Sequence, residues 1–96
     1  MGRAEIIAIL KNYKEEFAEQ YGIQEIGIFG SFARDDARGD SDVDVFVRIL
    51  KPDLFMLAGI KQDLEERFHM PVDIVRYREN MNQFLKNRID RESVYA

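Results

Sequence analysis

The segment that most constrains the fold joins a Gly-Ser pair to an alternating strand. Gly30 and Ser31 follow an apolar stretch at residues 24–29, and ten residues separate Ser31 from Asp42, where an alternating run over 42–49 begins. This spacing predicts two strands, with a small-residue turn and a short helix of two turns over 31–38 between them. A parallel crossover usually needs a full-length helix, and about a dozen residues do not supply one, so we expect the two strands to be antiparallel.

Two long helices are predicted on either side of these strands. Residues 3–20 carry apolar side chains at helical spacing, and Gly22 follows where a helix C-terminal glycine is common. Pro52 and Asp53 begin a second amphipathic helix that runs to about His69. Its core side is predicted to consist of Leu54, Leu57, Ile60, Leu64 and Phe68.

A third strand and a last helix complete the predicted order αβαβαβα. Residues 72–75 form a short apolar strand that can pair on the free side of the strand at 42–49. Asn80 and Gln83 are a plausible capping pair for a final helix with apolar side chains at Phe84, Leu85, Ile89 and Val94. The fold class is therefore α/β (α+β), with a small mixed sheet of about three strands flanked by helices in one domain over 1–96.

Composition excludes several classes of function. The chain has 96 residues, which allow one modest core and leave no room for a second domain that binds a large acceptor. Its net charge of −4 argues against free nucleic-acid binding, and the absence of cysteine excludes disulfides and thiolate metal sites. No apolar run approaches the length of a membrane span, and the first residues lack the apolar core of a signal peptide, so a cytoplasmic protein is expected.

An acidic pair at the start of the alternating strand indicates a metal site. Asp42 and Asp44 are two residues apart on a strand, so both carboxylates project from one face. Two like charges this close repel one another unless a cation or a proton lies between them. Carboxylate oxygens suit Mg²⁺ or Mn²⁺, and these ions are commonly shared with substrate phosphates.

Asp73 can extend this acidic pair, because it lies in the middle of the short third strand. If that strand pairs with residues 42–49, its carboxylate joins the same face, and three carboxylates could then hold two cations. A sheet-edge carboxylate with no ligand role is the alternative for this residue taken alone.

The Gly-Ser turn supplies the second half of a nucleotide site. Gly30 allows the backbone to approach a phosphate closely, and the N–H groups and the Ser31 hydroxyl can donate hydrogen bonds to it. Arg34 and Arg38 lie in or near the same loop and could neutralise a triphosphate, and the sequence does not decide which of them points inward.

These motifs resemble those of the DNA polymerase beta-type nucleotidyltransferase superfamily, and most closely its minimal nucleotidyltransferase (MNT) branch. The resemblance rests on Gly30-Ser31, on Ser41-Asp42-Val43-Asp44 and on Val72-Asp73-Ile74-Val75, and it covers almost the whole chain. It implies that Gly30 and Ser31 hold nucleotide phosphates, that Asp42, Asp44 and Asp73 are the metal carboxylates, and that Ser41 supports the Asp turn. One departure is Asp35, since relatives often have glycine after the loop arginine, which here is Arg34.

The resemblance also implies a reaction and a partner. Minimal nucleotidyltransferases commonly pair with a small helical HEPN-domain protein, in several cases a ribonuclease toxin. The nucleotidyltransferase then acts as antitoxin by transferring AMP from ATP to a tyrosine of the toxin, in a homo- or hetero-oligomer whose composition stays open.

Two other functions remain as alternatives. The chain could be a non-catalytic antitoxin that neutralises its partner by occlusion, because its size and acidic charge fit that role equally well. Nucleotidyl transfer to a small molecule or to RNA is less favoured, since the larger relatives that do this carry added acceptor domains.

Overall fold

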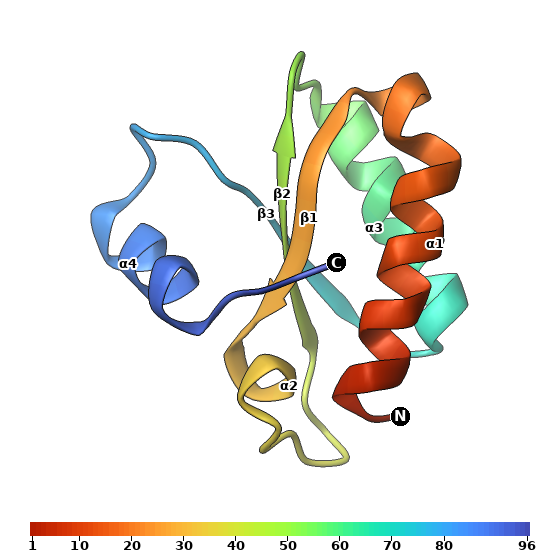
Figure 1. Cartoon of the computed structure of the whole chain (residues 1–96), viewed down its shortest axis with the longest axis vertical. Coiled ribbons are helices and arrows are strands. Elements are labelled where there is room, and N and C mark those ends of the chain that lie inside the picture. Colours follow the sequence, from red (N-terminus) through yellow and green to blue (C-terminus); the bar gives the residue numbers. More distant parts are fainter.

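The computed structural model describes all residues 1–96 and contains one mixed sheet with helices on both faces (Figure 1). The elements in chain order are α1 (Arg3–Tyr21), β1 (Ile23–Phe29), α2 (Gly30–Arg34), β2 (Val43–Ile49), α3 (Leu54–Phe68), β3 (Val72–Arg76), α4 (Gln83–Glu92) and β4 (Val94–Tyr95). The strand order is β3-β2-β1-β4. β1 and β2 are antiparallel, as the short connection predicted, and β3 pairs in parallel with the other side of β2.

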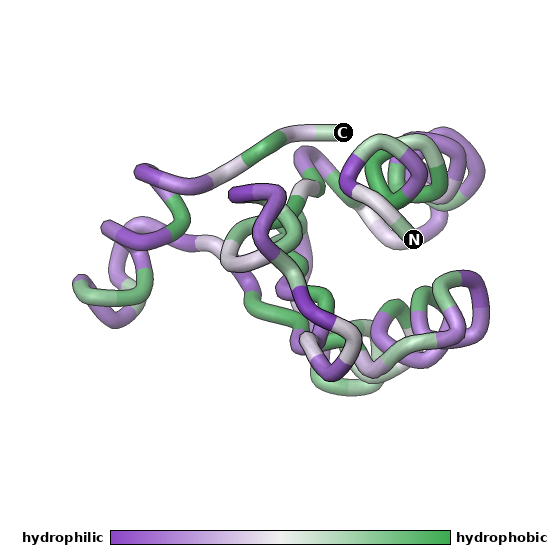
Figure 2. Tube along the Cα trace, turned by 90° about the horizontal axis from the view of Figure 1, so that it is seen from below, coloured by the Kyte–Doolittle hydropathy of each residue, from purple (hydrophilic) through white to green (hydrophobic).

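The helices divide between the two faces of the sheet. α1 and α3 lie together on one face and α4 lies on the other, and the view from below separates the two groups clearly (Figures 1 and 2). The main core fills the space under α1 and α3, where fully buried side chains include Ile6, Leu10, Tyr13, Ile60 and Leu64. A smaller cluster under α4 consists of Phe29, Phe46, Tyr77 and Ile89. The sheet is therefore covered on both faces, and its ends remain accessible.

The fourth strand corrects the predicted end of the chain. Val94 was expected in the last helix, but it lies in β4, which pairs antiparallel with Gly27 and Ile28 of β1. The glycine permits this approach, because a Cβ at position 27 would overlap the Val94 carbonyl oxygen and stand 2.6 Å from Cζ of Phe46. A strand of two residues is too short to show alternation in the sequence, which is why about three strands were expected and four are present.

Three predictions about the helices were also wrong in detail. α2 has five residues and ends at Arg34, because Asp35 adopts a left-handed conformation with φ of 65° and its N–H bonds back to the Phe32 carbonyl. The cap of α4 is Asn82 instead of Asn80, and its side chain accepts from the Leu85 N–H. Leu54 and Phe84, expected on core faces, are 84% and 75% exposed. Both lie in the first turn of their helix.

Other helix ends follow the sequence. Gly22 ends α1 with φ of 64°, and the Asp53 carboxylate caps α3 by accepting from the N–H groups of Phe55 and Met56. No helix of the chain is both long enough and apolar enough to cross a membrane.

Candidate nucleotidyltransfer site

The antiparallel pairing of β1 with β2 brings the Gly-Ser turn against the first acidic residue of the strand. Phe29, the last residue of β1, lies opposite Asp44, so Gly30 is directly beside the Asp44 side chain. Gly30 has φ of +75°, and a Cβ there would overlap Oδ2 of Asp44 and stand 3.1 Å from its Cγ. Glycine is therefore required at this position both by the backbone conformation and by the space that the carboxylate occupies.

The parallel pairing of β2 with β3 places the third acidic residue beside the second. Asp44 and Asp73 are register partners, so their side chains leave the same face of the sheet as Phe46, toward α4. Asp42 precedes β2 and is exposed, as is Asp73, whereas Asp44 is half-buried. This register confirms that Asp73 shares a face of the sheet with Asp44.

The electrostatics of Asp44 reflect this arrangement. Burial raises the pKa of the Asp44 carboxyl above its usual range, the negative charge of Asp73 raises it further, and Arg88 partly offsets both. The negative charges of Asp42 and Glu92 also raise the pKa of Asp44. No three of the chain's acidic side chains converge closely enough to form a ready cation cluster. Asp44 and Asp73 are neighbours in the register, and two carboxylates that repel one another in a partly desolvated position have the chemistry that a divalent cation relieves, so this pair fits such an ion.

Glu92 of α4 is the contact at this site that the sequence did not reveal. Its Oε1 accepts a hydrogen bond of 3.1 Å from the Gly30 N–H, and its Oε2 is 3.0 Å from Nη1 of Arg34. Arg88, one helical turn earlier, is 3.6 Å from the same carboxylate and places its guanidinium 5.5 Å from the centre of the Phe29 ring. A carboxylate thus already engages a backbone donor and a cation of the Gly-Ser turn and its short helix.

The sequence held one signal for this cluster. Arg88 and Glu92 are four residues apart on a helix, which is the spacing of an ion pair along one helix face. That spacing does not say which surface the pair contacts. In the structure the surface of this pair is the site itself, where Arg88 lies against Glu92 and the Phe29 ring.

Of the two loop arginines, Arg34 points to the site and Arg38 does not. Arg34 is bonded to Glu92 and to Asp36, and these carboxylates raise the pKa of its guanidinium. Arg38 contributes its backbone instead, and its N–H donates to the hydroxyl of Ser41, which closes the turn before Asp42 at 2.9 Å.

The departure at Asp35 also has a structural explanation. Asp35 occupies the left-handed position that ends α2, where glycine is the most common residue. Aspartate tolerates this conformation better than most side chains do, so the loop keeps its turn without the glycine.

Comparison with known proteins identifies the family. The family model described as polymerase beta, nucleotidyltransferase, matches residues 5–95. The chain belongs to this family. It is a nucleotidyltransferase with a nucleotide substrate, and its mixed sheet is the sheet of that fold.

Three known proteins are similar to this chain over most of its length. A protein adenylyltransferase MntA from Thermococcus cleftensis is 36% identical over 93 residues, which are 96% of this chain and 93% of that protein. A solved chain assigned to the minimal nucleotidyltransferases has a TM-score of 0.77 at 28% identity, covering 98% of this chain and 95% of its own length. An MNT antitoxin solved in complex with a tri-AMPylated HEPN toxin of Shewanella oneidensis has a TM-score of 0.73 at 17% identity, over 97% of this chain and 70% of that one. The likeness to the last protein concerns the fold alone.

Proposed function

We propose that the chain transfers AMP from ATP to a tyrosine hydroxyl of a HEPN-type partner protein and acts as its antitoxin. The observation that carries the proposal is the contact of the Gly30 turn with Asp44, beside Asp73, at one end of the sheet. Hydrogen-bond donors that can bind phosphate lie there beside acidic side chains that can bind a cation, and nucleotidyl transfer requires both. The 36% identical relative named protein adenylyltransferase supports the choice of AMP and of a protein acceptor.

Each residue of the site has a distinct role in this proposal. Gly30 and Ser31 bind the phosphates, with Ser41 supporting the acidic turn and Arg34 neutralising the triphosphate. Asp42, Asp44 and Asp73 would hold Mg²⁺ or Mn²⁺, with two ions expected. When bound, these cations neutralise phosphate charge and lower the pKa of the attacking hydroxyl.

The reaction is a substitution at the α-phosphorus of ATP. The tyrosine oxygen forms a new bond to this phosphorus, the bond to the bridging oxygen breaks, and pyrophosphate leaves. Asp73 is the more exposed acid of the paired strands, and it can accept the proton that the tyrosine hydroxyl loses. Arg34 exchanges its Glu92 partner for a phosphate oxygen as the nucleotide enters.

The experiment is intact-mass spectrometry of the purified chain with its HEPN-type partner, ATP and Mg²⁺. The partner is expected to gain one or more AMP units, and Asp42→Asn and Asp44→Asn are expected to abolish the gain. Asp40→Asn is the matched control, because Asp40 is an exposed acid two residues before Asp42 and belongs to no predicted ligand set. A stable complex that binds ATP but never modifies the partner would reject transfer and favour the non-catalytic antitoxin.

A further inference from the structure

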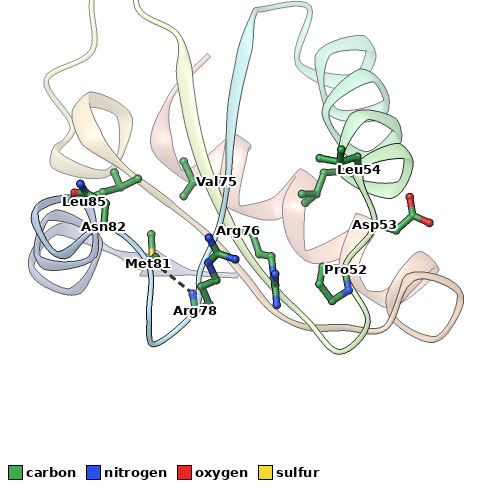
Figure 3. Close-up of a pocket in the computed structure, with 10 residues that line it drawn as sticks. Pro52, Asp53, Leu54, Val75, Arg76, Arg78, Met81, Asn82 and Leu85 are labelled. Atoms are coloured by element: carbon green, nitrogen blue, oxygen red, sulfur yellow. Dashed lines mark hydrogen bonds between the residues drawn. The ribbon is translucent and has the colours of Figure 1, made fainter.

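A pocket of about 460 Å³ lies away from the nucleotide site, at the other end of β3. It is an open groove lined by the N-terminal ends of α3 and α4 and by the end of β3, and Figure 3 shows Leu54 and Pro52 on one side and Asn82 and Leu85 on the other. Asp73 is near the start of β3 and Arg76 ends it. Arg76 comes three positions after Asp73 along the strand, which corresponds to about 10 Å, so the pocket and the acidic residues are distinct places.

The pocket is positively charged, although the whole chain carries −4. Arg76 and Arg78 both line it, and neither forms an ion pair within the chain. Nε of Arg76 is buried and has no hydrogen-bond partner. Two guanidinium groups are therefore available to an anionic group that enters from outside.

The N-terminal end of α4 strengthens this charge, because its cap, Asn82, is neutral. Both α3 and α4 direct their N-terminal ends at the pocket, and neither helix has an acidic residue in its first turn. The one carboxylate at the pocket, Asp53, caps α3 and points away from the cavity in Figure 3. Helix N-termini carry partial positive charge. The Asp53 carboxylate already offsets that of α3, so the N-terminus of α4 is the one that favours an anion here.

The walls of the pocket are apolar, which separates it from a site for a small free anion. Leu57, Val75, Met81 and Leu85 line it beside the arginines. At its edge, Leu54 is 84% exposed and its neighbour Phe55 is 88% exposed. Large apolar side chains around a cationic centre are typical of a protein interface, where they surround a charged contact and exclude water from it.

We propose that this pocket receives a segment of the partner protein in which an Asp or Glu side chain lies between large apolar residues. The carboxylate pairs with Arg76 and Arg78, and the apolar neighbours cover Leu54 and Phe55. The inference rests on the proposed function in one respect, since the partner is taken to be the acceptor protein. It adds a second point of attachment, away from the nucleotide site, that holds the acceptor while its tyrosine reacts.

The test measures binding of the HEPN-type partner to the chain without nucleotide, by calorimetry or biolayer interferometry. Arg78→Glu is expected to weaken binding about tenfold or more, since a reversed charge opposes the incoming carboxylate. Leu54→Asp is expected to weaken it as well, and folding should not suffer, because Leu54 is exposed and an acid in the first turn suits the helix N-terminus. Lys11→Glu on α1 changes the net charge by the same amount as Arg78→Glu, and as an exposed residue away from the pocket it should leave affinity within about twofold.

The outcomes separate this inference from the proposed function. Loss of binding in Arg78→Glu and Leu54→Asp, with unchanged ATP affinity of the isolated chain, would support the pocket even if no AMP transfer were detected. Wild-type affinity in both variants would overturn it even if AMP transfer were intact. Absence of any complex with the wild-type chain, or weaker ATP binding in Arg78→Glu, would overturn it too, the latter because the pocket would then serve the nucleotide.

Discussion

Replacing Gly30 by alanine tests the central geometry of the site most directly. Gly30 has φ of +75°, and an alanine held in the left-handed region costs roughly 1–2 kcal/mol relative to glycine. The added Cβ would also overlap Oδ2 of Asp44, so the carboxylate or the turn must move. In a domain of this size 1 kcal/mol corresponds to about 4–8 °C in Tm, so Gly30→Ala should lower Tm by at least about 5 °C.

Gly30→Ala should also lower the rate of AMP transfer. Displacing a group of an active site by about 1 Å can cost on the order of a hundredfold in rate, so AMP transfer by Gly30→Ala should drop by about that factor under conditions where the variant is folded. Thermal unfolding by circular dichroism and the intact-mass assay measure the two effects separately.

Gly59→Ala is the matched control for Gly30→Ala. Gly59 lies inside α3, and no atom lies within 4 Å of the position that an added Cβ would take, so alanine should raise stability by about 0.5–1 kcal/mol and leave transfer unchanged. A Gly30→Ala protein with wild-type Tm and wild-type transfer would refute the argument that the turn and Asp44 fit together only through glycine.

Three further predictions concern single side chains. The pKa of Asp44 is raised in the folded protein, so its ionisation opposes folding at neutral pH and this cost vanishes below the ordinary carboxyl pKa of about 3.9. Asp44→Asn should therefore be more stable than the wild type in urea at pH 8 and equal to it at about pH 3.5. A variant that is less stable than the wild type at pH 8 would contradict the raised pKa of Asp44. Glu92→Gln keeps an acceptor for the Gly30 N–H but removes the ion pairs with Arg34 and Arg88. The affinity for ATP, measured by calorimetry, should therefore rise several-fold. Asp35 is a nearby acid without an ion pair, and Asp35→Asn should change this affinity less. Tyr13→Phe removes the hydrogen bond of 2.8 Å to Asp63 that links α1 to α3. The free energy of unfolding, measured by chemical denaturation, should fall by about 1 kcal/mol. An unchanged denaturation midpoint would argue that this hydrogen bond does not stabilise the fold.

The sequence alone determined the elements whose signals are local. The alternation over 42–49 and the helical spacing of residues 3–20 reflect one-sided burial, and each element repeats this pattern often enough to be recognised. Gly22 and Asp53 fix helix ends through their own backbone and side-chain chemistry. The short connection after β1 forced an antiparallel pair, and that pairing in turn placed the Gly-Ser turn beside Asp44.

The tertiary structure decided what depends on segments far apart in the chain. Glu92 accepts a hydrogen bond from Gly30, which lies 62 residues earlier in the chain. β4 pairs with Gly27, although its two residues are too few to show the alternation of a strand. The sequence does not indicate that Arg76 and Arg78 lack an ion-pair partner. It also does not indicate that both line a pocket between two helix ends. Local patterns report which side of an element is buried, but not which surface buries it, so these contacts exist only once the sheet and its helices have assembled.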